Sequence, residues 1–328
     1  MDTIKLTVGI PTYNRCDEIK QALDSVMPQV SILDDVDVVI VDNASADRTA
    51  EVVREYQDRF SGKISYCRNT ENIGFAANVD AVVKAARGEY VLILSDDDAL
   101  EHEAVRYVLD VLSMHRVTAL FLGWAAWNRD MSAPLQRQTS VPDVSGRAYA
   151  NGSEYVVGER AFPPGLISGY VVNRSAWADA GALDFRETLV VQILTVLRMA
   201  KDSPVYASYI PYVRYRTENE VSDKTFYRNS LCLFRHRVEP IEGLARVCAG
   251  YSSEALRLLR RNAMRTIIYH LVVDERCGNV DFKELERRII AANGRFNVHT
   301  LIVSALIRVP LFVLNLCKWG FDCSRKLG

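Results

Sequence analysis

The sequence predicts an α/β protein built on a mostly parallel sheet flanked by helices. The first observation is that short β-favouring runs alternate with amphipathic helical patterns over about the first 125 residues, as they do in βαβ units. The second is that DVVIV at 37–41 and YVLIL at 90–94 are almost continuously apolar, which is typical of strands buried on both faces.

The elements follow one another in the order that such units require. We expect strands at residues 5–10, 37–41, 64–67, 90–94 and 119–122. With Ser45 as the cap of the second helix, helices are expected at 17–26, 45–60, 75–86 and 103–114. Residues 128–165 are rich in Pro, Gly, Ser and Arg and predict long loops; a strand-like run at 165–174 and a helix at 189–200 follow. Beyond Thr225 the pattern is helical.

Charge is spread unevenly along the 328 residues, although the net charge is only −1. Residues 1–223 hold 22 Lys and Arg against 32 Asp and Glu, whereas 224–328 hold 18 against 9. We therefore expect one domain at 1–223 and a helical, basic C-terminal region at 224–328 that meets an anionic partner. Seven dispersed cysteines without metal-ligand spacing predict reduced thiols in a cytosolic protein, and the first residues predict a strand and a turn rather than a signal peptide.

Three consecutive aspartates, Asp96, Asp97 and Asp98, end the apolar run at 90–94. Like charges this close raise one another's pKa and oppose folding unless a cation or hydrogen bonds offset them. One interpretation is that they cap the next helix, since Asp is a good N-cap. The other is a metal or phosphate site, because open α/β sheets bind ligands at the carboxyl ends of their strands. No GxGxxG follows the first strand and no GxxxxGK[ST] occurs, which argues against a dinucleotide-binding domain and a P-loop NTPase.

Four segments carry a specific resemblance: GIPTYNR at 9–15, VDNASADRT at 41–49, NTENIGFAANV at 69–79 and GEYVLILSDDDAL at 88–100. In this order and spacing they resemble the family 2 glycosyltransferases, which have the GT-A fold. The resemblance covers about residues 4–115 and weakens towards 200. It implies a donor half at 1–125 and an acceptor half at 126–223, and transfer of a sugar from a nucleotide-diphospho-sugar.

The resemblance also implies donor-site residues. The turn after the first strand would approach the base and ribose through Pro11, Tyr13 and Arg15, although turn chemistry alone also explains these residue types. The aspartate that ends the second strand, Asp42, would recognise the base; its alternative role is to cap the next helix. The Asn and Gly of the third segment match Asn72 and Gly74.

A divalent cation, Mn²⁺ or Mg²⁺, is expected at the aspartates, where it would neutralise the leaving diphosphate. By register Asp97 matches the principal metal ligand, Asp96 a ribose or metal contact, and Asp98 a further ligand. Family members usually read Asp-x-Asp-Asp here, whereas this chain has Ser95 in the first place, a change that would weaken metal binding without excluding it.

The catalytic base is less clearly marked. The family often supplies it from a Glu-Asp pair at the start of a helix, but Leu189 and Val190 stand there, with Gln192 following. Glu187 is the candidate base and Asp184 the reserve, and each is also explained as a helix-start carboxylate. This variation resembles the branch that adds deoxysugars to bacterial O-antigen units. Trp124, Trp127 and Trp177 are either stacking platforms for sugars or core residues.

The expected function is thus a metal-dependent, inverting hexosyl or deoxyhexosyl transferase of bacterial surface-polysaccharide or O-antigen synthesis. Its acceptor would be a saccharide linked to a polyprenyl diphosphate, and nucleic acid is not expected as a partner. The apolar stretch at 301–321, interrupted by Arg308 and Pro310, either lies on the anionic inner face of the plasma membrane or packs within a helical subdomain. A nucleotide-sugar hydrolase and a non-catalytic scaffold that binds nucleotide-sugars or membranes are the alternatives.

Overall fold

The computed structural model describes residues 4–135, 144–161, 163–186, 188, 190–217, 243–244 and 247–273, with residues 283, 286, 287, 290, 301 and 302 besides. The chain divides into two compact units. The first consists of Met1–Tyr155, Pro163–Glu187 and Val191–Asn219, and the second of Val156–Phe162, Thr188–Val190 and Glu220–Gly328.

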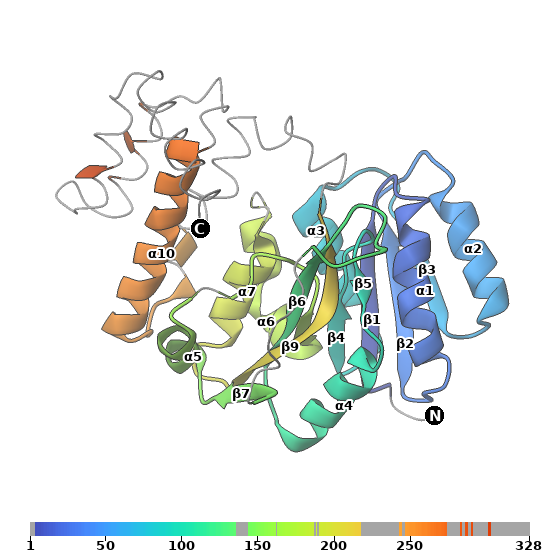
Figure 1. The fold of residues 1–328 in the computed structure, drawn as a ribbon, viewed down its shortest axis with the longest axis horizontal. Helices are drawn as coiled ribbons and strands as arrows, with labels where there is room; N and C mark the ends of the chain where they lie inside the picture. The colour runs from blue at the N-terminus through green and yellow to red at the C-terminus, as the bar shows by residue number, and fades with distance from the viewer. Residues whose placement is uncertain are drawn as a thin grey trace. The chain divides into compact units, whose positions relative to one another are not determined.

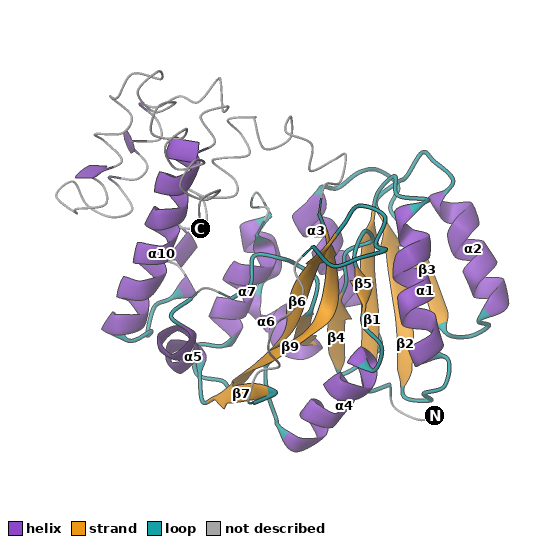
Figure 2. Cartoon of the chain, in the orientation of Figure 1, coloured by secondary structure: helices purple, strands orange, loops and turns teal. Residues whose placement is uncertain are grey.

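The first unit is built on a nine-stranded sheet (Figures 1 and 2). Its strands are β1 Leu6–Thr12, β2 Val36–Asp42, β3 Ile64–Arg68, β4 Tyr90–Ile93, β5 Ala99–Leu100, β6 Ala119–Trp127, β7 Gly146–Tyr149, β8 Tyr170–Asn173 and β9 Val205–Arg216. The order across the sheet is β3-β2-β1-β4-β8-β6-β9-β5, with β7 paired to β9. Strands β3, β2, β1 and β4 run parallel, β8 is antiparallel to both of its neighbours, and β6 and β9 are parallel to each other.

The helices within the described residues are α1 Glu18–Val30, α2 Thr49–Arg59, α3 Phe75–Ala85, α4 Ala104–Met114, α5 Gly152–Glu159, α6 Arg174–Ala180, the 3₁₀ helix η1 Ala182–Phe185, α7 Val191–Met199 and α10 Ser253–Val273. Helix α1 packs against α2 and α4, whereas α3 packs against α6 and η1. The chain crosses from β1 towards β3 and then returns to β4, so right-handed crossovers place α1 and α3 on opposite faces of the sheet.

Strand order reverses at β1. The chain passes from β1 to β2 and β3 on one side, and β4 then pairs with the other side of β1. Ligands of open α/β sheets bind at such a reversal, outside the carboxyl ends of the strands. A ligand-binding site is therefore expected at the residues that follow β1 and β4.

The centre of the sheet is fully buried. Every residue of β1, β2 and β4 is buried, which confirms the expectation from their apolar runs. Pro11 lies in β1 but is two residues past Gly9, the last residue that pairs with β4. The Gly9 carbonyl accepts from Leu94 N at 3.0 Å, so Gly9 and Pro11 both face the β4 side of the strand. Because β1 and β4 no longer pair at Pro11, the sheet loses no hydrogen bond through the N–H that proline lacks.

Two expectations about the elements were wrong. Ser45 does not cap the second helix: α2 begins at Thr49, and the Ser45 hydroxyl accepts a hydrogen bond from Asn14 N at 2.8 Å instead. The expected loop at 128–165 contains β7 and α5, and β9, a strand of 12 residues, was not predicted. Within the described residues, no helix is long and apolar enough to cross a bilayer. The apolar stretch at 301–321 lies outside the described residues apart from 301 and 302.

Gly9 allows α3 to pack directly on β1. A Cβ at this position would lie 2.3 Å from Val82 Cγ1 and 3.1 Å from Val91 Cγ1. We expect Gly9→Ala to lower the free energy of unfolding by about 1–3 kcal/mol, because a methyl group is forced into a packed interior. Urea unfolding would measure the change. Gly165→Ala is the matched control, since its Cβ would meet nothing within 4 Å; an equal loss in both variants would contradict the explanation.

Candidate functional site

The candidate site lies at the edge where β1 and β4 end. Tyr13 follows β1 and Asp96 follows β4, and the Tyr13 N–H donates to Asp96 Oδ2 at 3.3 Å. The Tyr13 side chain is 45% exposed, whereas Pro11 is buried in the strand. The turn after the first strand and the aspartate segment, which are 83 residues apart, thus form one surface.

The three aspartates point in three directions. Asp96 turns towards β1 and is buried. Asp98 turns into the protein, where its carboxylate accepts from the Ser168 hydroxyl and from Arg216 N at 2.9 Å. Asp97 lies between them and is the most exposed of the three, with 18% of its side chain exposed, and its Oδ2 lies 3.9 Å from Arg15 Nη2.

Burial makes two of these carboxyls weak acids. Desolvation and, second, the charge of Asp97 together raise the pKa of Asp96 to about 7, against the opposing effects of Thr12, Arg15 and the Tyr13 N–H. Desolvation also raises the pKa of Asp98 to about 8, again together with the charge of Asp97. Near neutral pH the segment therefore carries fewer than three negative charges.

The aspartate segment suits a cation that is coordinated mainly by the phosphate oxygens of a bound molecule. In the part of the chain that the structure describes, no three His, Cys, Asp or Glu side chains converge into a closed cage. A cation that bridges phosphates needs only one or two carboxylates beside phosphate oxygens and water. Asp97 fits that requirement, with Asp96 next to it; Asp98 is engaged on the opposite side of the chain by Ser168 and Arg216.

Ser95 acts on Asp97 directly. Its hydroxyl donates to Asp97 Oδ1 at 2.6 Å, and its own N–H donates to the Ser168 hydroxyl at 2.9 Å. The serine that replaces the usual first aspartate thus fixes one oxygen of the Asp97 carboxylate. The other oxygen, Oδ2, faces Arg15.

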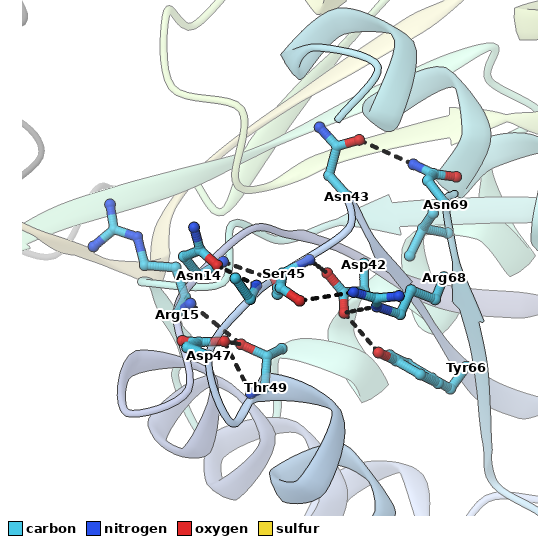
Figure 3. A network of polar contacts seen from close by, with 12 residues as sticks. Asn14, Arg15, Asp42, Asn43, Ser45, Asp47, Thr49, Tyr66, Arg68 and Asn69 are labelled. Atoms are coloured by element: carbon cyan, nitrogen blue, oxygen red, sulfur yellow. Dashed lines mark hydrogen bonds and ion pairs between the residues drawn. The ribbon is translucent and has the colours of Figure 1, made fainter. Parts of the chain in front are cut away.

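Asp42 is enclosed by hydrogen bonds (Figure 3). It is 0% exposed; its Oδ1 accepts from Ser45 N at 2.8 Å and its Oδ2 accepts from the Tyr66 hydroxyl at 2.6 Å. Arg68 Nε lies 3.6 Å from the same Oδ2, and Arg68 Nη2 donates to the Ser45 carbonyl at 2.9 Å. The carboxylate holds the turn after β2 against the end of β3, where the Arg68 side chain is half exposed.

The turn after β1 is fastened to the turn after β2 (Figure 3). Asn14 has a φ of +53°, a conformation that Asn tolerates better than most residues, and its Oδ1 accepts from Ala46 N at 2.7 Å. Arg15 N donates to the Thr49 hydroxyl at 3.3 Å, and Asp47 accepts from Cys16 N and Thr49 N at 3.0 Å each. The Arg15 backbone is fixed in this way, which directs its side chain towards Asp97.

A set of amide side chains fixes the loop before α3. Asn43 Nδ2 donates to Asn72 Oδ1 at 2.8 Å, and Asn69 Nδ2 donates to Asn43 Oδ1 and to Asn78 Oδ1 at 3.0 Å each. Gly74 N also donates to Asn72 Oδ1 at 2.9 Å, and Gly74 has a φ of +85°, which favours glycine. Asn72 and Gly74 are therefore brought to the same edge as Asp42, beside the residue that follows it.

The two candidate bases are placed differently. Glu187 lies outside the described residues. Asp184 belongs to η1, where its Oδ2 accepts from Arg198 Nη1 at 2.7 Å in the last turn of α7. Gln192 lies at the other end of α7, fully buried, with its Nε2 donating to the Gly165 carbonyl at 3.0 Å. Asp184 is thus held by a cation at the end of α7 that is remote from Gln192.

The three tryptophans differ in exposure. Trp177 is fully buried, and its indole N–H donates to Asp80 at 3.0 Å, so it belongs to the core. Trp124 is 49% exposed and meets Tyr215 edge-on with ring centroids 5.8 Å apart. The ring of Trp127 is covered by the Arg214 guanidinium at 4.6 Å.

The residues that bond the buried side of the aspartate segment were not predicted from the sequence. Ser168 and Arg216 both bond Asp98, from 70 and 118 residues away. Neither lies in a motif, and Arg216 belongs to the unpredicted β9. No local pattern could have identified them, because their contacts arise only when β9 and β8 take their places in the sheet.

The comparisons with known proteins point to one family and one fold. Residues 7–154 match the model of the family described as Glycosyl transferase family 2. Abequosyltransferase RfbV of Salmonella typhimurium is 36% identical over 96 residues, 29% of this chain and 29% of the relative. Poly(ribitol-phosphate) beta-N-acetylglucosaminyltransferase TarS of Staphylococcus aureus is 30% identical over 144 residues, 43% of this chain and 25% of the relative. The match of residues 7–154 to the family 2 model confirms the resemblance seen in the sequence.

Solved structures confirm the fold. S. aureus TarS 1-349 in complex with UDP is similar with a TM-score of 0.59 at 16% identity, covering 96% of this chain and 88% of that chain. Mannosyltransferase PcManGT from Pyrobaculum calidifontis in complex with GDP-Man and Mn²⁺ is similar with a TM-score of 0.53 at 17% identity, covering 96% and 87%. The GT-A-like α/β fold is thereby confirmed. The matches span less than a third of the length of the first curated relatives.

The raised pKa values predict how stability depends on pH in the absence of metal. Unfolded aspartates ionise near pH 4, whereas folded Asp96 and Asp98 keep their protons up to about pH 7 and about pH 8. Between these values the unfolded state binds fewer protons, so the free energy of unfolding falls as pH rises. Each group contributes a slope of up to about 1.4 kcal/mol per pH unit.

Asp98→Asn should make this slope smaller. The amide oxygen can still accept from Arg216 N, and the amide nitrogen can donate to Ser168, while no proton is lost. Urea unfolding from pH 5 to pH 8 in EDTA would measure the slope, with the exposed Asp34→Asn as the control. Identical slopes in wild type and Asp98→Asn would show that Asp98 does not titrate in this range.

Proposed function

We propose that this chain transfers a sugar from a nucleotide-diphospho-sugar donor to a saccharide acceptor, with a divalent cation bound at Asp97. One observation carries the proposal: at the point where the strand order reverses, Asp97 is the most exposed of three consecutive aspartates and lies beside Arg15, in the turn after the adjacent strand β1. The names of the relatives and the nucleotides in the solved structures of TarS and PcManGT support it.

Different residues of the chain would bind the cation, the phosphates, and the base and ribose. Asp97, with Asp96 beside it, would hold the cation, and the bound cation supplies positive charge to the diphosphate as the glycosidic bond breaks. Arg15, 3.9 Å from Asp97, would bind the phosphate oxygens once the cation takes the carboxylate. Base and ribose would lie against Tyr13 after β1, Asp42 at the end of β2, and Asn72 and Gly74 in the loop before α3.

Catalysis needs a base on the acceptor hydroxyl, opposite the leaving group. Glu187 remains our proposal for that base in an inverting transfer. Asp184 is the weaker candidate, because its ion pair with Arg198 would have to break before it could accept a proton. Either Mn²⁺ or Mg²⁺ suits the oxygen ligands.

Thermal-shift titration with UDP, CDP, GDP and dTDP, each with and without Mn²⁺, tests the donor site. A ligand that binds only the folded state raises the unfolding midpoint by mass action. We expect one nucleotide to raise it in a metal-dependent way, and Asp97→Asn to abolish the metal-dependent part. Asp202→Asn, whose side chain is 82% exposed beside Lys201, is the control.

The outcomes separate the alternatives. Loss of turnover in Asp97→Asn, with sugar transferred to a saccharide in wild type, supports the transferase. Release of free sugar faster than transfer would indicate a hydrolase, and nucleotide binding without any turnover a scaffold. No shift with any of the four diphosphates would contradict the proposal.

We also propose that the acceptor is a polyprenyl-diphosphate-linked saccharide of bacterial surface-polysaccharide synthesis, met at the inner face of the plasma membrane. The excess of Lys and Arg at 224–328 supports this placement, and Arg257 and Arg260 of α10 are exposed. Basic residues near an anionic surface each contribute about 1 kcal/mol of attraction.

Sedimentation with vesicles would test the membrane contact. We expect the full chain to sediment with phosphatidylglycerol-containing vesicles at low salt and to be released by salt. Neutral phosphatidylcholine vesicles are the control. A chain that stays in the supernatant with both kinds of vesicle would contradict the proposed location.

A further inference from the structure

The side chain of Arg216 lies directly behind the aspartate segment. It is the last residue of β9 and is buried, with 6% of its surface exposed. Its Nε donates to the Asp97 carbonyl at 2.7 Å, and its backbone N–H donates to Asp98 Oδ1 at 2.9 Å. One residue therefore holds two consecutive members of the segment, one by the main chain and one by the side chain.

The rest of the guanidinium is anchored on the opposite side. Nη1 donates to the Arg129 carbonyl after β6, and Nη2 donates to Gln21 Oε1 on α1. The planar fork thus joins three segments that are far apart in the sequence. A buried cation is costly unless negative charge and hydrogen bonds compensate for it, and oxygen atoms accept hydrogen bonds from its Nε, Nη1 and Nη2 here.

These contacts determine which way Asp97 faces. Asp96 is tied to Tyr13 N on one side, and Asp98 to Arg216 N and Ser168 on the other. Because the Asp97 carbonyl is drawn inward to Arg216 Nε, its peptide unit cannot rotate freely. Its carboxylate is left facing Ser95 and Arg15.

We propose that Arg216 is a positioning residue that aims the Asp97 carboxylate at the cation bridging the donor diphosphate. This inference rests on the proposed function. Groups that orient a metal ligand typically change metal affinity by about 10–100-fold when they are altered. Arg216 touches neither donor nor cation in this arrangement and acts only through the backbone of Asp97 and the side chain of Asp98.

Arg216→Lys is the primary test. Lysine keeps the charge but has no planar fork, so it cannot reach the Asp97, Arg129 and Gln21 oxygens together. Gln21→Ala is a second, milder variant, because Gln21 is exposed and touches Arg216 but is not part of the aspartate segment. Arg214→Lys is the matched control: Arg214 lies two residues away on the same strand, and its Nη2 pairs with Glu101 at 2.6 Å.

The measurement is isothermal titration of UDP, CDP, GDP and dTDP into each variant, with Mn²⁺ and with EDTA. The ratio of the Kd in EDTA to the Kd with Mn²⁺ isolates the metal-linked part of binding. We expect this ratio to fall about 10-fold or more in Arg216→Lys, to fall less in Gln21→Ala, and to stay unchanged in Arg214→Lys. The Kd in EDTA should stay within about twofold of wild type in all three.

A purely structural role would give a different result. Arg216→Lys would then lose stability, as Arg214→Lys would, but the ratio would remain that of wild type in every variant, and the inference would be overturned. If wild type itself showed no metal-linked binding of any of the four diphosphates, the proposed function would fail and this inference with it.

Discussion

The structure depends on how three adjacent carboxylates are accommodated at the end of a buried strand. Two are buried, Asp96 against Tyr13 N and Asp98 against Ser168 and Arg216 N, and burial beside Asp97 raises the pKa of both. Such an arrangement costs stability near neutral pH unless positive charge is close. Arg15 and Arg216 supply part of it from two sides. A bound divalent cation would supply the rest of this positive charge, so the cost in stability and the proposed function have the same origin.

The sheet brings together the groups that this arrangement needs. Parallel strands β1, β2 and β4 end at one edge, which sets Tyr13, Asp42 and the aspartates side by side although they are distant in sequence. Strand β9 adds a contribution from the far part of the first unit, because it pairs with β5 at Ala99 and Leu100, immediately after Asp98. Its last residue can therefore bond the aspartate segment. The donor motifs alone do not build the site; the later strands hold it in place.

Much of the donor half could be predicted from the sequence, and the reason is local. Buried parallel strands are almost continuously apolar, and β2 and β4 were found where DVVIV and YVLIL lie. Strand β9 could not be predicted, because its alternating polar residues and Pro211 do not resemble such a strand; Pro211 is tolerated where the pairing with β6 shifts register near Gly123. Ser45 looked like a helix cap, but a tertiary contact with Asn14 takes its hydroxyl. The role of Arg216 was hidden for the same reason, since its partners lie 87 to 195 residues away.

A crystal structure of the chain with UDP or GDP and Mn²⁺, with anomalous scattering recorded for manganese, would test the central claim most directly. The account predicts a manganese peak within about 2.5 Å of an Asp97 oxygen, bridged to the diphosphate, with the base near Asp42 and the Arg216–Asp97 hydrogen bond retained. A nucleotide bound elsewhere, or manganese held away from Asp97, would contradict it.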